Sequence, residues 1–334
     1  MPYDAPPAPL TDSFGRAVTY LRVSVTDRCD LRCTYCMAEK MAFLPRKDLV
    51  SLEDLARLTD AFVDLGVRKV RVTGGEPLVR RNVLDLFRHL ARRLDAGQVD
   101  EVTLTTNGTQ LPRYAYDLAA LGVRRVNVSL DSLSTDRYQK ITRIGALDKV
   151  LAGLDAAQKA GLKVKLNALA SRGPFEREVD DLIRFAHGRD MDLTLIEEMP
   201  MGKTGLDRAA SFLPISELRR DLATRWTLLN SDHRTGGPAE YVDVAETGGR
   251  IGFITAMTCG FCSACNRVRL SCTGKLYTCM ADEGSVDLRE GPSGWTGDLH
   301  ARIRAAVQNK PKGHRFLENG SCSATQRHMS ALGG

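Results

Sequence analysis

The sequence has no long apolar run, and this argues against membrane-spanning and secreted proteins. No stretch approaches the roughly 18 consecutive apolar residues of a membrane-spanning helix. The segment from Met1 to Ala17 is polar and proline-rich, without the apolar region of a secretory signal. We therefore expect a cytoplasmic protein whose nine cysteines are reduced or bind metal rather than form disulfides.

The sequence also lacks concentrated charge. Lysine and arginine number 47 against 41 aspartates and glutamates, a net charge of +6, and the basic residues are scattered. A nucleic-acid-binding surface would be more clustered, so we expect neither a nucleic acid nor a membrane as partner. The positive balance favours a polyanionic small molecule, although a solvated surface would give the same total.

What the chain does carry is a cysteine group near its start. Cys29, Cys33 and Cys36 are spaced C-x3-C-x2-C, with Tyr35 before the last. A structural zinc site would need a fourth ligand, and the histidine closest in sequence is His89. A four-iron cluster usually takes four cysteines, so three would leave one iron open for chemistry. An incomplete zinc knuckle remains the alternative.

A repeating strand–helix pattern follows. It predicts strands over 18–25, 69–73, 102–106, 126–130, 163–170 and 193–199, and helices over 52–65, 82–94, 113–121, 147–160, 175–187 and 215–224. Six such units imply a parallel sheet and favour an incomplete (β/α)6 barrel, with a doubly wound open sheet as the competitor. We expect a disordered tail over 1–12 and the barrel over 13–230.

Unusual residues fall where these strands end. They are the cysteine loop, the run from Thr73 to Pro77 and residues 105–108, 129–132 and 197–200. Because the carboxyl ends of parallel strands share one face, we expect a site at that face. The two glycines of Thr73-Gly74-Gly75-Glu76-Pro77 permit close backbone approach, and Glu76 is a candidate acceptor for the amino group of a ligand.

A second cysteine group lies in the C-terminal region, over 231–334. Cys262, Cys265 and Cys279 are spaced C-x2-C-x13-C and again suggest a cluster with an open iron. Between them, Arg267 and Arg269 share one face if the segment is extended, and two guanidiniums beside an open metal suggest anion capture. A zinc knuckle completed by Cys259 or Cys272 stays open as an alternative. Residues 241–245 and 251–255 are expected to form a hairpin, and residues 299–308 a helix.

The C-x3-C-x2-C loop with Gly-Gly-Glu-Pro resembles radical S-adenosylmethionine (SAM) enzymes. Together with C-x2-C-x13-C, Asn266-Arg267-Val268-Arg269-Leu270 and the final Gly333-Gly334, the pattern resembles the GTP 3′,8-cyclase family of molybdenum cofactor biosynthesis, from about Thr19 to the end. The resemblance implies an α/β fold: a partial (β/α)6 radical SAM barrel with a C-terminal α+β region that carries a second iron–sulfur cluster.

The resemblance also implies the cofactors and the site residues. Two 4Fe-4S clusters would be held by Cys29, Cys33 and Cys36 and by Cys262, Cys265 and Cys279. SAM would contact Tyr35, Gly75, Ser129 and Met199. GTP would contact Arg22, Lys69, Arg71, Thr105, Lys165, Arg267, Val268 and Arg269. The catalytic residues would be Arg267, Arg269, Gly333 and Gly334. From the residues alone, Lys69, Arg71 and Lys165 could equally be solvated cations, and the last glycines could be frayed.

The implied activity is that of a lyase. A radical made from SAM would abstract a hydrogen atom from carbon 3′ of the ribose of GTP, and the sugar radical would attack carbon 8 of guanine, giving (8S)-3′,8-cyclo-7,8-dihydroguanosine 5′-triphosphate. The implied partners are a low-potential electron donor and a downstream pyranopterin synthase, with the chain as a monomer or homodimer. The rivals are a peptide-modifying radical SAM maturase with an auxiliary cluster and a zinc-bearing nucleic-acid-binding module.

The sequence departs from the family pattern at a few positions. Thr194 stands where many members carry an arginine, so one phosphate contact is expected to be lost or moved. Cys259, Cys272 and Cys322 are additional cysteines, which we interpret as bystander thiols.

Overall fold

One continuous sheet organises the molecule. The computed structural model describes residues 9–205, 207–258, 261–289, 298–314, 316 and 325–333. The sheet has 12 strands in the order β12-β11-β10-β1-β2-β3-β4-β5-β6-β9-β8-β7. Their bounds are β1 Tyr20–Ser24, β2 Lys69–Thr73, β3 Glu101–Thr106, β4 Arg125–Ser129, β5 Lys163–Ala170, β6 Asp192–Glu197, β7 Leu228–Asn230, β8 Glu240–Val244, β9 Arg250–Ile254, β10 Arg267–Leu270, β11 Lys275–Tyr277 and β12 Val286–Asp287.

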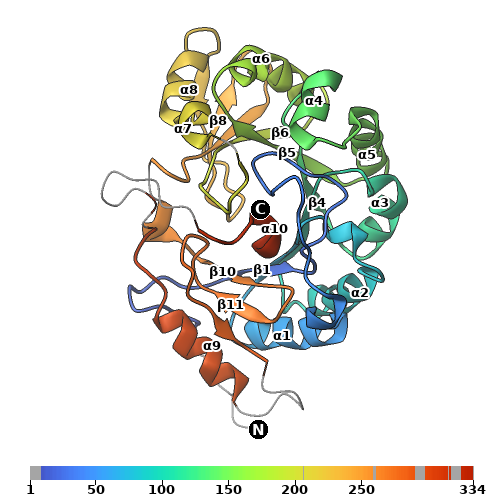
Figure 1. Cartoon of the computed structure of the whole chain (residues 1–334), viewed down its shortest axis with the longest axis vertical. Coiled ribbons are helices and arrows are strands. Elements are labelled where there is room, and N and C mark those ends of the chain that lie inside the picture. The colour runs from blue at the N-terminus through green and yellow to red at the C-terminus, as the bar shows by residue number, and fades with distance from the viewer. Residues whose placement is uncertain are drawn as a thin grey trace.

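Helices surround the curved sheet (Figure 1). Their bounds are α1 Leu52–Asp64, α2 Leu84–Asp95, α3 Leu111–Ala120, α4 Thr135–Thr142, α5 Leu147–Lys159, α6 Pro174–His187, α7 Arg208–Ser211, α8 Ile215–Leu222, α9 Leu299–Gln308 and α10 Met329–Leu332. The short α10 is the exception, because it lies in the middle of the ring of strands. No helix in the described ranges is both long and apolar enough to cross a bilayer.

Successive side chains of each strand alternate between the outer face of the sheet, which packs against the helices, and the inner face, which carries polar residues. Leu21, Val23, Val70 and Val72 are fully buried in the core beneath the helices. Since successive strand residues point to opposite faces, the residues between them point inward. Parallel strands packed on both faces read as continuous apolar runs, so polar residues at every second position indicate a lumen that receives a polar ligand.

The six predicted strand–helix units and the fold class are confirmed. Ser51 caps α1 as its sequence indicated, because its hydroxyl oxygen accepts a hydrogen bond from the Asp54 amide at 3.0 Å. The strands β8 and β9 also form the expected antiparallel hairpin. The helices α4 and α7 were not predicted.

The sheet also extends beyond the six units. β9 pairs in parallel with β6, and β10 pairs in parallel with β1. Strands from both sides of residue 230 therefore belong to one sheet, and the division of the chain at that residue stays a prediction. Residues 9–12, which we assigned to the disordered tail, pack instead: Leu10 is buried, and its carbonyl accepts from the Val18 amide at 2.7 Å.

Candidate active site

The first cysteine loop leaves the carboxyl end of β1 and is fastened to neighbouring strand ends. The Tyr35 hydroxyl donates to the Asp131 carboxylate after β4 at 2.8 Å. Asp30 accepts from Asn107 at 2.7 Å and from Thr109 at 2.7 Å, both after β3. Sequence reasoning missed Asp30 and Asp131 as loop anchors, although both lie in motifs that it singled out.

The three cysteines fit an open iron–sulfur cluster better than a zinc ion. Cys29, Cys33 and Cys36 are free and half-buried. Among the described residues, no group of three or more His, Cys, Asp or Glu side chains surrounds a point where a single ion could bind. In a four-iron cube each cysteine binds a different iron, so the sulfurs need not converge on one point. Burial raises the pKa of the Cys36 thiol to about 12, so a bound metal would have to stabilise the thiolate.

The glycine loop after β2 lies directly on this cysteine loop. The Gly75 amide donates to the Thr26 carbonyl and the Glu76 amide to the Arg28 carbonyl, both at 2.8 Å. The Glu76 carboxylate accepts from the amides of Leu78 at 3.0 Å and Asn107 at 2.7 Å and from the Thr106 hydroxyl at 2.9 Å. Burial raises the pKa of this carboxyl to about 7. In this structure Glu76 therefore joins two loops rather than facing a ligand.

Basic side chains occupy the inner face between the strand ends. Arg22 is in register with Arg71 on β2 and with Arg269 on β10. Burial and the charge of the neighbouring Arg267 together lower the pKa of Arg269 to about 10. Burial, with the charges of Arg71 and other cations, holds the pKa of Lys165 well below its ordinary range. Crowded, desolvated cations of this kind are stabilised by an anionic ligand.

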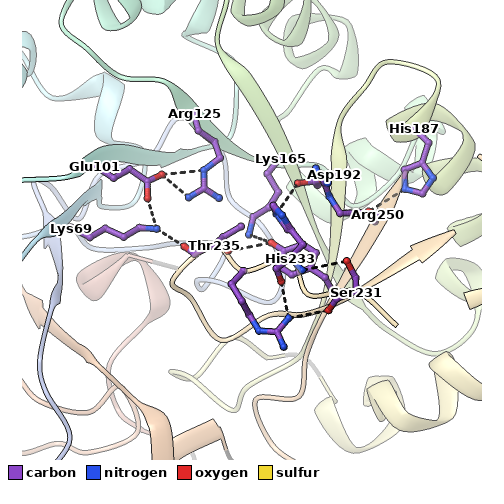
Figure 2. A network of polar contacts seen from close by, with 12 residues as sticks. Lys69, Glu101, Arg125, Lys165, His187, Asp192, Ser231, His233, Thr235 and Arg250 are labelled. Atoms are coloured by element: carbon purple, nitrogen blue, oxygen red, sulfur yellow. Dashed lines mark hydrogen bonds and ion pairs between the residues drawn. The ribbon is translucent and has the colours of Figure 1, made fainter. Parts of the chain in front are cut away.

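Two of these cations are engaged at the amino ends of the strands. As Figure 2 shows, Lys69 contacts the Glu101 carboxylate at 2.5 Å and donates to the Thr235 carbonyl at 2.6 Å. Lys165 donates to the Tyr241 hydroxyl at 2.9 Å. These contacts lie beside a cavity of about 840 Å³, whose lining also includes His187 and Arg250. Thr235 and Tyr241 therefore contact the two lysines at this end of the sheet.

The first cysteine group follows β1, and the second group lies at the opposite end of the pair formed by β1 and β10. Cys262 and Cys265 precede β10, and Cys279 follows β11, which is antiparallel to β10. Because β10 is parallel to β1, this group is at the amino end of the pair and the first group is at the carboxyl end. The five residues of β1 between them span about 13 Å at the usual strand rise.

The surroundings of the second group suit thiolate ligands. The three cysteines line a cavity of about 150 Å³ together with Arg22, Arg267 and Arg269. Burial would raise the pKa of Cys265, but the charges of Arg267 and Lys310 outweigh it and lower that pKa to about 7. The Lys310 ammonium is 3.5 Å from the Cys265 sulfur. Sequence reasoning missed Lys310, which is distant from both motifs in the chain.

Comparisons with known proteins agree with this architecture. Residues 23–186 match the Radical SAM superfamily, and residues 191–316 match Molybdenum Cofactor Synthesis C. Proteins named GTP 3′,8-cyclase are 57% identical in Rhizobium etli (strain CIAT 652), over 100% of this chain and 97% of that protein, and 56% identical in Agrobacterium fabrum, over 98% and 95%. The chain belongs to the GTP 3′,8-cyclase family. It is thus a radical SAM enzyme, a group whose members use a 4Fe-4S cluster and SAM.

A solved structure of Streptococcus suis SuiB bound to precursor peptide SuiA shares the fold with this cyclase-family chain. The TM-score is 0.62 at 14% identity, and the likeness covers 94% of this chain and 76% of that one. At this identity the likeness supports the fold alone. It does not favour the rival interpretation as a peptide-modifying maturase.

Gly333, one of the two terminal glycines singled out by the resemblance, lies beside Arg269 on the inner face of the sheet. Arg269 Nη1 donates to the Gly333 carbonyl at 2.7 Å. Gly333 has a φ of +73° and lies against Thr73 and Gly74 at the end of β2. The frayed end that the residues alone allowed is not found over 325–333, whereas Gly334 lies outside the described residues.

The other residues that the resemblance assigned to SAM or GTP differ in burial and in position. The Thr105 hydroxyl is buried without a hydrogen-bond partner among the described residues, so its hydrogen-bonding capacity is available to a ligand. Ser129 ends β4, and Met199 follows β6 and lines the cavity at the second cysteine group. The Val268 side chain lies in the core, so only its backbone could meet GTP. The amide oxygens of Asn127 and Asn167 are likewise buried without a partner among the described residues, and sequence reasoning missed both.

The extra cysteines lead to a prediction about iron content. Cys272 is 1% exposed, in the turn between β10 and β11, while Cys259 and Cys322 lie outside the described residues. Cys265→Ala should lose about four irons per chain, whereas Cys272→Ala and Cys259→Ala should lose none. Chemical iron analysis after anaerobic reconstitution checks this. Loss of about four irons from Cys259→Ala would contradict the ligand assignment.

Proposed function

We propose that this chain converts GTP to (8S)-3′,8-cyclo-7,8-dihydroguanosine 5′-triphosphate, the first step of molybdenum cofactor biosynthesis. The observation that carries the proposal is a set of desolvated cations on the inner face of the sheet, between two groups of three cysteines at opposite ends of β1 and β10. The name shared by the curated relatives supports GTP as the substrate.

The chain's own residues would divide the work between the two ends of the lumen. Cys29, Cys33 and Cys36 would hold the first cluster, with SAM placed against Tyr35, Gly75, Ser129 and Met199. When bound, the cluster and SAM supply the radical that can take a hydrogen atom from an unactivated C–H bond. The position of Gly75 supports this placement, because the lack of a Cβ lets its backbone lie directly against the cysteine loop.

At the other end, Cys262, Cys265 and Cys279 would hold a second 4Fe-4S cluster, with the guanine near Arg267, Arg269 and the Val268 backbone. Arg22, Lys69, Arg71, Lys165 and Thr105 would bind the triphosphate. Guanidiniums bind phosphate oxygens through paired hydrogen bonds, and a fixed substrate keeps carbon 3′ and carbon 8 within reach of each other. Burial of the lumen by the tail would exclude water during the radical steps.

The experiment that tests the proposal is an anaerobic assay. Reconstituted protein should be brown, contain about eight irons per chain, and convert GTP in the presence of SAM and dithionite. A panel of nucleotides then tests the base and the phosphate number. A colourless zinc protein, or cleavage of SAM with no change in GTP, would contradict the proposal. A low-potential electron donor, a downstream pyranopterin synthase and a monomeric or homodimeric state remain predictions.

Lys165 provides a test of triphosphate binding. Its ammonium is buried, and no ion pair joins it to a carboxylate within the part of the chain that the structure describes. Lys165→Met should raise KM for GTP by roughly 10- to 100-fold, the range for a lost hydrogen bond to a charged group. The same change should raise the midpoint of thermal unfolding without GTP, because it removes a desolvated charge.

The pH dependence of this stabilisation has a definite sign. The folded-state pKa of Lys165 is depressed, so at neutral pH the charged form opposes folding. The increase in stability caused by Lys165→Met should therefore become smaller as the pH rises toward about 10.4, where the lysine of the unfolded chain also loses its proton. Lys163→Met is the matched control, because Lys163 is on the same strand but exposed. An equal effect of both variants on KM would contradict the assignment of Lys165.

A further inference from the structure

The C-terminal tail, residues 325–333, touches the second cysteine loop before it reaches the lumen. Arg327 Nη1 is 2.5 Å from the Glu283 carboxylate, and Nη2 donates to the carbonyls of Met280, at 3.4 Å, and of Asp282. The guanidinium also lies over the Tyr277 ring, 4.3 Å from its centroid. One side chain thus contacts both sides of Cys279, which we propose as a cluster ligand.

Further contacts continue the tail from this point into the lumen. The Gln326 amide donates to the Glu283 carboxylate at 2.7 Å. Thr325 forms a parallel bridge to Met201, in which its amide donates to the Pro200 carbonyl at 3.1 Å. At the far end, Arg269 holds the Gly333 carbonyl. The tail is therefore fixed at its start and at its end, and Arg327 supplies the side-chain contacts between its start and the chain after Cys279.

The carbonyls of Met280 and Asp282 accept from Arg327 only while the chain after Cys279 keeps its present path. That path is short and irregular, because β11 ends at Tyr277 and the next strand begins at Val286. A cluster held by Cys279 would fix this path, since metal binding and local folding are coupled. The guanidinium fits this one arrangement of acceptors, because its donors have a fixed planar geometry.

We propose that Arg327 is a positioning residue that makes docking of the C-terminal tail depend on an intact second cluster loop. The lumen would then be closed by the tail only in chains in which the residues around Cys279 are in place. This inference rests on the proposed function for the role of the tail in turnover. The coupling itself is a property of the free protein and can be measured without substrate.

The experiment is hydrogen–deuterium exchange of the C-terminal peptide, in reconstituted protein without GTP or SAM. Arg327→Gln should speed exchange over 325–333 by roughly tenfold or more, the effect of losing hydrogen bonds to a charged group, and should retain the full iron content. The exchange rate of Arg327→Lys should lie between those of the unsubstituted protein and Arg327→Gln, because lysine keeps the charge but lacks the planar guanidinium. Arg289→Gln is the matched control, because Arg289 pairs with Asp287 at 3.2 Å in the same region without a described contact to the tail.

The decisive variant is Cys279→Ala, which disrupts the loop while keeping Arg327. It should speed exchange of the tail as much as Arg327→Gln does, and the double variant should show little further increase, because both changes break one coupling. Protection of the tail in Cys279→Ala, additive effects, or loss of iron from Arg327→Gln would each overturn the inference. Failure of GTP conversion with this pattern intact would count against the proposed function alone.

Discussion

Gly333→Ala is expected to reduce turnover of GTP by roughly a hundredfold or more while leaving both clusters in place. A Cβ on residue 333 would overlap the Thr73 hydroxyl and lie 2.6 Å from the Thr73 Cβ. Rotation of the threonine side chain does not relieve this overlap, because its Cβ is fixed by the backbone of β2. Residue 333 also has a φ of +73°, which L side chains rarely adopt. The tail must therefore withdraw from the strand end.

Two measurements separate this effect from a general loss of structure. Iron content should be unchanged, and the rate of GTP conversion should fall. Gly161→Ala is the matched control: Gly161 has a similar φ of +77°, with no atom near its missing Cβ, so it tests backbone strain alone. An extension of the chain beyond Gly334 should also abolish turnover with both clusters intact. Full activity in either tail variant would show that the tail is not needed in the lumen.

Much of the barrel could be predicted from local signals. The strands β2 and β5 begin and end where the alternation of residues indicated, and the helix caps followed from single residues such as Ser51. The spacing of the cysteines predicts two cluster sites, because ligand spacing is largely a local property, and the ligand assignments stay predictions. The inward direction of Arg267 and Arg269 followed from the two-residue period of a strand.

The parts that could not be predicted depend on long-range pairing. Nothing in the sequences of β9 and β10 indicates that they pair with β6 and β1, because the sequence of a strand does not specify which strand lies beside it. The same limit applies to Leu10, which belongs to the buried core although the segment around it is polar and proline-rich. The partners of Glu76, which come from loops after two strands, also become visible only in the folded chain.

The inner face of the sheet departs from the usual residue pattern of parallel strands, and the departure has a physical reason. Parallel strands normally bury apolar residues on both faces, yet the inner face here carries Arg22, Arg71 and Lys165. Charges at buried positions oppose folding unless they are compensated. Their presence is explained if an anion binds them, so the residues that violate the pattern of a stable sheet are those that we assign to the substrate.

Gly75→Ala is expected to abolish reductive cleavage of SAM and to lower the iron content from about eight toward about four per chain. A Cβ on residue 75 would lie 2.7 Å from the Asp27 carbonyl oxygen and 2.7 Å from the Arg28 carbonyl carbon, and it would overlap the Arg28 oxygen. These are backbone atoms in the loop that leads into Cys29, so no rotamer change can make room. The cysteine loop must move away from the glycine loop.

The displacement would break the contacts that place the cluster beside SAM. The hydrogen bonds from the Gly75 and Glu76 amides to the Thr26 and Arg28 carbonyls join the two loops, and both would be lost if the loops separated. Gly237→Ala is the control, because a Cβ there would meet nothing closer than 3.8 Å. Formation of 5′-deoxyadenosine and the iron content are the two readouts. If Gly75→Ala kept full iron and cleaved SAM normally, the close approach of these loops would not be needed to build the site.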